Sequence, residues 1–321
     1  MDDNIEKDVN IPQCDMMTVF GQYDENVKLI ESNLSVNIVL RDNKIKISGN
    51  KSNIQSAEIV LKRLFRLSQN NESIDIQTVR YALDIVSKQK NKKIDNISED
   101  VLVLTHLGKP IKCKTLGQTE YIESIKQNTV VFGIGPAGTG KTYLAMAMAV
   151  KAFKRNEVNK IILTRPAIEA GEKLGFLPGD MQSKVDPYLR PLYDALFEIM
   201  GPEVFEKNME RGLIEVAPLA YMRGRTLNNA FIVLDEAQNT TTAQMKMFLT
   251  RIGFNSKVVV TGDLTQVDLP SEKMSGLMSV TKALKDVEGI GFSYLNRSDV
   301  VRHPIVQNII EAYELYESKN E

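Results

Sequence analysis

Residues 135–142 read G-P-A-G-T-G-K-T and fit the pattern G-x-x-x-x-G-K-[ST] at every position. The glycines allow a tight loop whose backbone N–H groups converge on phosphate oxygens, and a following helix adds the positive end of its dipole. Lys141 supplies an ammonium group for the β- and γ-phosphates, and Thr142 supplies a hydroxyl for Mg²⁺. An apolar run precedes the loop and a helical pattern follows it. The sequence therefore predicts an ATP phosphate cradle, the P-loop, formed by Gly135, Pro136, Ala137, Gly138, Thr139, Gly140, Lys141 and Thr142.

Two carboxylates follow a second apolar run, F-I-V-L at 231–234. A strand that presents Asp235 at its carboxyl end places this side chain beside the Mg²⁺ shell. The next residue, Glu236, can then polarise a water for in-line attack on the γ-phosphate. An apolar strand ending in Asp-Glu is common by itself, and the preceding P-loop gives this one its significance. The adjacent Glu favours hydrolysis over kinase chemistry, which requires an acceptor rather than an activated water.

A third apolar run, V-V-V-T-G-D-L-T-Q at 258–266, ends in a polar turn. Gln266 is a candidate to hydrogen-bond the γ-phosphate or the attacking water, although the segment alone is a generic strand and turn. Three arginines, Arg165, Arg223 and Arg225, stand beside Pro or Gly. Such loops suit phosphate binding by the guanidinium fork, and a solvated surface charge is the alternative for each arginine.

The elements that must position these side chains begin at about residue 100, where strand patterns alternate with helical stripes. Strands are expected at 129–134, 161–164, 213–216, 231–234, 258–261 and 290–295, and helices at 143–153, 186–200, 242–252, 275–287 and 303–316. This alternation predicts an α/β fold with a doubly wound, mostly parallel sheet. The methionine pairs Met146/Met148 and Met245/Met247 are interpreted as core packing.

The first hundred residues have a different organisation. Residues 1–15 are polar and are expected to form a flexible N-terminus. A small α/β module with an extra helix is expected over 16–87, from helical patterns at 25–31, 52–67 and 76–86 and strand patterns at 36–40 and 45–47. The stretch 88–99, which contains K-Q-K-N-K-K, is interpreted as a linker, and 100–321 as the second domain.

Composition excludes several classes of protein. Among 321 residues, 40 Lys and Arg balance 41 Asp and Glu, so a dominant polyanion-binding field is excluded. No apolar run reaches the roughly 18 residues of a membrane span, and no leader is evident, so a cytoplasmic location is expected. Two cysteines, Cys14 and Cys113, and two histidines, His106 and His303, argue against a zinc site or a disulfide scaffold.

Several longer stretches resemble one known family. With the P-loop, they are L-T-R-P-A-I-E-A-G-E at 163–172, L-G-F-L-P-G at 174–179, D-P-Y-L-R-P at 186–191, A-P-L-A-Y-M-R-G-R-T at 217–226 and D-E-A-Q-N at 235–239. Together they resemble the PhoH family of bacterial P-loop ATPases over roughly residues 100–317. The resemblance implies a RecA/helicase-like P-loop NTPase fold, ATP and Mg²⁺ as cofactors, predicted ATPase activity and an association with RNA metabolism.

Three further roles follow from the helicase-like character of that family. A Gly-Asp-x-x-Gln turn of helicases matches 262–266, which supports Gln266. Gln118 corresponds to a glutamine that reads the adenine edge, with a surface side chain as the alternative. Arg302 stands in R-H-P-I, similar to a helicase element whose arginine approaches the γ-phosphate, although one residue between Arg and His is missing here. Capping of a helix or pairing with Asp299 is equally open for Arg302.

The module at 16–87 resembles a KH domain, which clamps single-stranded nucleic acid with a Gly-x-x-Gly loop. Here the matching residues 21–24 are G-Q-Y-D, so Asp24 replaces the second glycine and would repel a phosphate. RNA binding and a structural or assembly role both remain open for this module.

The function expected from these features is ATP hydrolysis coupled to RNA binding or RNA processing, with single-stranded RNA and an RNA-processing protein as candidate partners. The alternative is an RNA-binding or assembly module in which ATP acts as a conformational lock with negligible turnover. A small-molecule kinase lacks a recognisable acceptor lid. With one motor domain, a γ-phosphate arginine must come from within the chain or from a neighbour, so a homo-oligomeric ring is expected, with a hexamer as the family-based number.

Overall fold

The computed structural model describes residues 5–41, 44–69, 74–88, 101–166, 181–270 and 274–301, and residues 305, 306, 309, 312, 313 and 316. The chain divides into two compact units, residues 1–96 with 302–321, and residues 97–301. The division near residue 96 falls within the predicted linker 88–99, of which only Lys88, the last residue of helix α4 (Ile76–Lys88), lies in the described part. The prediction places 302–321 in the second domain, and most of these residues lie outside the described part of the chain.

The first unit is built on a three-stranded antiparallel sheet with the order β1-β3-β2. Its strands are β1 (Ile5–Asn10), β2 (Val36–Arg41) and β3 (Lys44–Gly49). On the central strand, Ile45 and Ile47 are fully buried, because alternate side chains of a strand point to the same face. The strands predicted at 36–40 and 45–47 are therefore confirmed.

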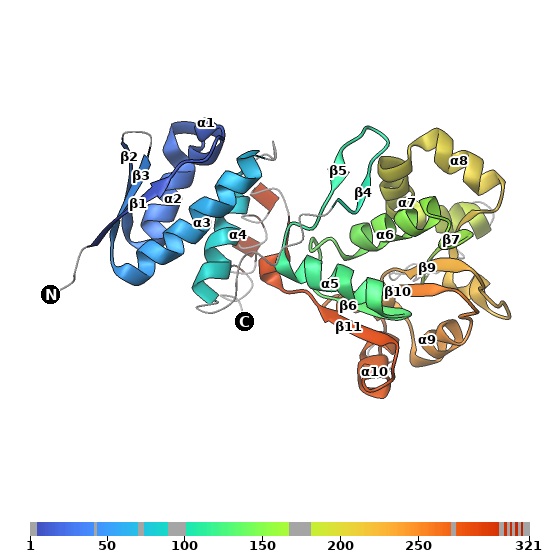
Figure 1. The fold of residues 1–321 in the computed structure, drawn as a ribbon. Helices are drawn as coiled ribbons and strands as arrows, with labels where there is room; N and C mark the ends of the chain where they lie inside the picture. The colour runs from blue at the N-terminus through green and yellow to red at the C-terminus, as the bar shows by residue number, and fades with distance from the viewer. Residues whose placement is uncertain are drawn as a thin grey trace. The chain divides into compact units, whose positions relative to one another are not determined.

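Helices cover this small sheet (Figure 1). They are α1 (Met16–Phe20), α2 (Glu25–Leu34), α3 (Lys51–Gln69) and α4, and both α2 and α3 pack against the strands. In α3, Ile54, Ala57 and Leu61 are buried at helical spacing, as the apolar stripe predicts. The predicted helices at 25–31, 52–67 and 76–86 all form, each slightly longer than expected.

The N-terminal segment differs from the prediction. Residues 5–10 of the expected flexible stretch 1–15 form strand β1, which pairs with β3 along its whole length. Its only buried side chain is Val9, so hydrophobic alternation gave no signal. Ion pairs of Lys7 with Glu58 and of Glu6 with Lys46 add side-chain contacts to the backbone ladder. A polar edge strand of this kind is specified by its partner rather than by its own sequence.

The second unit is built on a six-stranded sheet with the order β11-β6-β10-β9-β7-β8, in which every pair is parallel. Its strands are β6 (Val130–Ile134), β7 (Lys160–Arg165), β8 (Ile214–Pro218), β9 (Ala230–Leu234), β10 (Lys257–Gly262) and β11 (Ile290–Tyr294). The predicted doubly wound parallel sheet is confirmed. Strand β10 separates β6 from β9, so its carboxyl end lies between the P-loop and Asp235.

Helices cover both faces of this sheet (Figure 1). Side chains of α5 (Leu116–Gln127), α6 (Lys141–Lys154), α7 (Met181–Met200) and α8 (Pro202–Glu210) join one apolar core, and those of α9 (Thr242–Leu249) and α10 (Gly276–Ala283) join the other. Strand β9 contributes to both cores, with Phe231 and Val233 on one face and Ile232 and Leu234 on the other. A strand buried on both faces reads as a continuous apolar run, which explains why β9 was recognisable.

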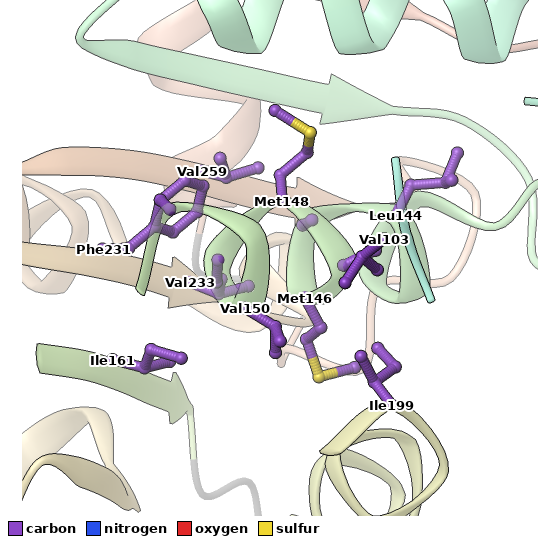
Figure 2. Packing of buried hydrophobic residues seen from close by; sticks show 14 of the residues in the cluster. Val103, Leu144, Met146, Met148, Val150, Ile161, Ile199, Phe231, Val233 and Val259 are labelled. Carbon is purple, nitrogen blue, oxygen red and sulfur yellow. The ribbon is translucent and has the colours of Figure 1, made fainter. Parts of the chain in front are cut away.

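The interpretation of the methionines as core residues is confirmed. Met146 and Met148 of α6 pack among Val233, Val259 and Ile199 (Figure 2), and Met245 is fully buried in the opposite core. The prediction omitted α5, α8 and the short hairpin β4 (Val103–Leu104) with β5 (Pro110–Ile111). Among the described residues, no helix has both the length and the apolar content needed to cross a bilayer.

Candidate functional site

The P-loop connects β6 to α6 at the carboxyl edge of the sheet. Gly138 and Gly140 have φ of +85° and +80°, a conformation that glycine adopts without steric cost. A Cβ atom on Gly135 would lie 2.4 Å from the carbonyl oxygen of Leu295, so only glycine fits there. Because Gly140 is the N-cap of α6, the unpaired N–H groups of the first helical turn face the loop. This is the geometry of an anion site at a helix N-terminus.

The Lys141 side chain is turned onto its own loop. Its Nζ donates to the carbonyl oxygens of Gly135 at 2.6 Å and Pro136 at 2.8 Å. The residue is 8% exposed and borders the cleft described below. A phosphate bound in the loop would compete with these two carbonyls for the ammonium group.

Gln118, on α5, contacts the backbone of the P-loop through its side-chain amide. Its Nε2 donates to the carbonyl of Thr139 at 3.0 Å, and its Oε1 accepts from the backbone N–H of Lys114 at 2.7 Å. The side chain is 4% exposed and both ends of its amide are held by backbone groups. The alternative of a surface side chain is therefore wrong, and the reading of an adenine edge by Gln118 stays a prediction.

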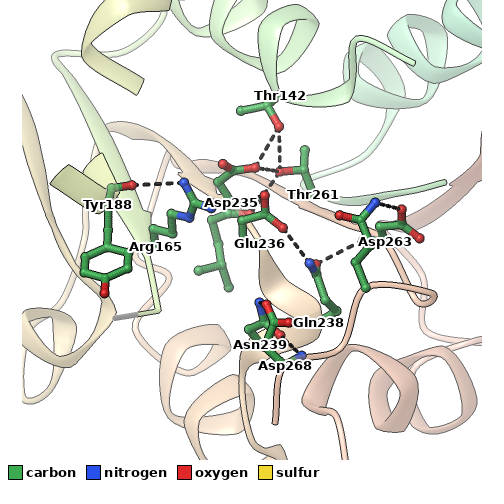
Figure 3. Close-up of polar contacts among 12 residues, drawn as sticks. Thr142, Arg165, Tyr188, Asp235, Glu236, Gln238, Asn239, Thr261, Asp263 and Asp268 are labelled. Carbon is green, nitrogen blue, oxygen red and sulfur yellow. Dashed lines mark hydrogen bonds and ion pairs between the residues drawn. The ribbon is translucent and has the colours of Figure 1, made fainter. Parts of the chain in front are cut away.

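Asp235, directly after β9, is held by two hydroxyls (Figure 3). Its Oδ1 accepts from Thr142 Oγ1 at 2.7 Å and from Thr261 Oγ1 at 2.7 Å. The nearby Tyr121 hydroxyl donates to the carbonyl of Lys141 at 3.3 Å; burial raises the pKa of Tyr121, and the Asp235 charge adds to the shift. The start of α6 is thereby tied to β9, β10 and α5.

The oxygen atoms of Thr142 and Asp235 fit Mg²⁺. This ion is commonly held by one or two carboxylates, with the remaining ligands supplied by phosphate oxygens and waters. A converging hydroxyl and carboxylate at the mouth of a P-loop supply the protein's share of that set. In the described part of the chain, no cluster of three or more His, Cys, Asp or Glu suits another metal.

Glu236 follows Asp235 with a φ of +51°, which a non-glycine residue adopts only under local constraint. Its Oε1 lies 3.2 Å from Nη2 of Arg165, at the end of β7. Its Oε2 accepts from Nε2 of Gln238 at 2.5 Å. Figure 3 shows both contacts converging on one carboxylate.

Gln238 also reaches the turn after β10. Its Oε1 accepts from the backbone N–H of Asp263 at 3.0 Å, and Asp263 Oδ2 accepts from Gln266 Nε2 at 2.7 Å. A chain of hydrogen bonds therefore runs from Glu236 to Gln266. Glu236, Asp263 and Gln266 border a cleft of about 270 Å³. The cleft is lined by predicted residues of all three motifs, namely Ala137, Gly138, Gly140, Lys141, Thr142, Asp235, Glu236 and Gln266.

The predicted loop arginines have different surroundings. Arg225 forms a two-pronged ion pair with Glu215, with N···O distances of 2.5 and 2.7 Å. This hydrogen bonding raises the pKa of Arg225. Arg223 is exposed in the same loop. Arg165 faces Glu236 rather than solvent, a contact that its position after a strand did not reveal.

Arg302, His303 and Pro304 lie outside the described residues, so the role of Arg302 stays a prediction. Its suggested partner Asp299 is 2% exposed and accepts from the backbone N–H groups of Gly117 at 3.2 Å and Asn296 at 3.0 Å. Asp299 therefore fastens the end of β11 to α5.

Thr261 and Gln238 were not among the predicted site residues. Both stand inside motifs that drew attention for other side chains, Thr261 at the end of an apolar run and Gln238 in D-E-A-Q-N. The available signal was their position near the ends of strands that carry charged residues. Their partners, Asp235 and Asp263, lie elsewhere in the sequence, so the contacts themselves could not be predicted.

A parallel sheet with a P-loop, a Thr–Asp pair and a following Glu defines the class of P-loop nucleotide-binding proteins. The family model described as PhoH-like protein matches residues 110–314. A PhoH-like protein of Bacillus subtilis is 52% identical over 298 residues, 93% of each chain, and one from Synechocystis is 50% identical over 301 residues, 93% of this chain and 91% of that one. Protein PhoH of Escherichia coli is 38% identical over 268 residues, 78% of this chain and 76% of that one. The chain belongs to the PhoH family, and its class is that of P-loop ATPase-like proteins.

Among solved structures, EssC (ATPases 2 and 3) from Geobacillus thermodenitrificans is 10% identical and aligns with a TM-score of 0.23 over 76% of this chain and 46% of that one. A likeness this low carries no argument about the site.

Lys141→Ala tests the phosphate cradle. It removes the cation of the P-loop but leaves β6 and α6 intact, so tight ATP binding should be lost while circular dichroism stays unchanged. Isothermal titration calorimetry with ATP and Mg²⁺ measures the effect. Lys154→Ala, at the exposed end of the same helix, is the matched control and should bind normally. Unaltered binding by Lys141→Ala would contradict the assignment.

Proposed function

We propose that the protein is a Mg²⁺-dependent ATPase whose turnover is coupled to RNA binding or RNA processing. The observation that supports ATP hydrolysis is the convergence on one cleft of Lys141, the Thr142–Asp235 pair and Glu236. Phosphate, metal and water chemistry each have a side chain there of the required type. Membership of the PhoH family is consistent with this activity.

In the proposed reaction, the N–H groups of the P-loop and the Lys141 ammonium bind the β- and γ-phosphates. Bound Mg²⁺ would neutralise phosphate charge, with Thr142 and Asp235 as its protein ligands. Glu236 accepts a proton from water as the water oxygen forms a bond to the γ-phosphorus. The bond from this phosphorus to the bridging oxygen breaks, which releases ADP and phosphate. Gln266 is the candidate to hydrogen-bond the γ-phosphate or the attacking water, and its Nε2 donates to Asp263 Oδ2.

Glu236→Gln separates binding from hydrolysis, because the amide has the same size but cannot take the proton. ATP affinity should remain close to that of the wild type while kcat falls about 100-fold or more, as is typical for the loss of a general base. Phosphate release and calorimetry measure the two quantities. Glu123→Gln, an exposed residue paired with Lys126, serves as the control. An equal loss of ATP affinity would place Glu236 on the metal instead.

One observation favours the alternative, in which ATP is a conformational lock. Both oxygens of Glu236 have protein donors, Arg165 and Gln238. Donors to a carboxylate stabilise its charged form and weaken it as a base, so tight ATP binding without turnover is expected if this effect outweighs the orientation that the donors give. Negligible turnover by the wild type, together with tight ATP binding, would favour the lock over the ATPase.

RNA coupling rests on the loop between α1 and α2. Gly21, Tyr23 and Asp24 have positive φ angles of 78°, 54° and 61°. Tyr23 is 85% exposed, and an exposed aromatic ring can stack on an unpaired base. Asp24 has the left-handed backbone that glycine would favour, but it also carries a negative charge. Substitutions that change only the charge, or both the charge and the backbone strain, can therefore separate the two effects.

Asp24→Gly and Asp24→Asn test this loop in the full-length chain. Both remove the negative charge, so both should bind single-stranded RNA severalfold more tightly in fluorescence anisotropy. Only glycine also relieves the left-handed strain, which is worth at most about 1 kcal/mol of stability. Basal ATPase should be unchanged. If neither variant nor wild type binds RNA, the module serves assembly rather than RNA recognition.

We also propose a homo-oligomeric ring, with six subunits as the family-based number, an RNA-processing protein as a partner, and a cytoplasmic location. Arg225 is paired with Glu215, and Arg165 with Glu236. The candidates for a further arginine at the γ-phosphate are then Arg302, which comes first, and the exposed Arg223, from the same chain or from a neighbour. Supply from a neighbour to every site requires a closed head-to-tail ring.

Mixing two inactive chains tests supply by a neighbour. Arg302→Ala keeps its P-loop, and Lys141→Ala keeps its arginine, so a mixture should regain part of the ATPase activity. Loss of such an arginine lowers turnover about 1000-fold or more. Each variant alone should therefore have very little activity, and recovery in the mixture is easy to detect. Light scattering reports assembly at the same concentrations. A fully active monomer would overturn the ring.

A further inference from the structure

Arg165 is the last residue of β7, the strand that pairs with β9 and therefore runs beside Asp235. Its side chain is 21% exposed and contacts groups on two different elements. Nη2 lies 3.2 Å from Glu236 Oε1, and Nη1 donates to the backbone carbonyl of Tyr188 on α7 at 3.0 Å. Figure 3 shows the guanidinium between these two groups. Arg165 therefore connects Glu236, the candidate general base, to helix α7.

Glu236 needs such a contact to hold one orientation. It follows Asp235 beyond the end of β9 and has a left-handed backbone, its side chain is 35% exposed, and a glutamate has three rotatable side-chain bonds. Gln238 fixes one carboxylate oxygen and leaves rotation about that contact possible. A charge-assisted hydrogen bond to the second oxygen removes that freedom. A general base must be held within about 0.5 Å of its productive position, so the second contact affects the rate directly.

We propose that Arg165 is the positioning residue of Glu236: it fixes the carboxylate that accepts the proton of the attacking water, and it takes its own orientation from the backbone of α7. This inference rests on the proposed ATPase function. Arg165 is assigned to act through Glu236 because its guanidinium pairs with that carboxylate and with the Tyr188 carbonyl, whereas Lys141, Thr142 and Asp235 line the cleft. Its effect should therefore appear in kcat and disappear when Glu236 can no longer act as a base.

Arg165→Ala in the full-length chain should lower kcat by about 10-fold or more, the scale of a misplaced catalytic group. The KM for ATP and the affinity for a fluorescent ATP analogue should stay within about twofold of the wild type, because the phosphate cradle is untouched. Arg165→Lys keeps one charged donor and should retain an intermediate kcat. The analogue affinity also shows that the variants are folded around the P-loop.

A double-mutant cycle separates this role from others. In the Glu236→Gln background, single-turnover hydrolysis should be the same with Arg165 or Ala at position 165. Arg155→Ala is the matched control, since Arg155 also pairs with a glutamate, Glu157 at 3.8 Å. Arg155 caps the carboxyl end of α6, whereas the P-loop lies at the other end of this helix. It should leave kcat unchanged in both backgrounds.

The outcomes distinguish this inference from the proposed function. A wild type without turnover overturns both. A wild type that hydrolyses ATP, with an Arg165→Ala variant that is equally fast, overturns the positioning role alone. A loss of the same size in the presence and absence of Glu236 also overturns it, because Arg165 would then act independently of the base.

Discussion

The buried carboxylate of Asp235 holds the carboxyl edge of the second unit together. It is 7% exposed, and burial of a charge is costly unless hydrogen bonds compensate for the lost water. Thr142 brings the first turn of α6 to it, and Thr261 brings β10. The strand order makes this possible, because β10 lies between the P-loop strand and β9. The same contacts that stabilise the carboxylate therefore set the spacing of the three motifs.

Lys141, Arg165 and Glu236 all have partners within the protein. Lys141 donates to loop carbonyls, and Arg165 pairs with Glu236. Such contacts avoid the cost of unpaired buried charge, but each of them opposes any ligand that must replace it. In the proposed ATPase, a phosphate that takes the Lys141 ammonium would replace two carbonyls, so the net affinity would be the difference between phosphate binding and loss of these contacts. Glu236 differs, because its contact with Arg165 can persist while water binds.

Sequence alone predicted the parts of the site that are local in the chain. The P-loop, the Asp235–Glu236 pair and the Gln266 turn are short segments, each at the end of an apolar run that is buried on both faces. The contacts of Arg165, Gln118 and Asp299 were not predictable in this way, since each joins elements that are distant in sequence. Strand β1 was missed for the same reason: its pairing with β3 compensates for a polar sequence.

The Glu236 carboxylate links catalysis to structure outside the cleft. Through Gln238 and Asp263 it communicates with the turn that carries Gln266, and through Arg165 with α7. A displacement of α7 changes the Arg165 contact, and a displacement of the turn after β10 changes the Gln238 contact. Asp235 is itself held to β10 through Thr261, so β10 and the turn that follows it are linked to both carboxylates. Helix α7 reaches Glu236 through Arg165, and in the proposed ATPase its position would therefore affect the orientation of the base more directly than the Thr142–Asp235 pair.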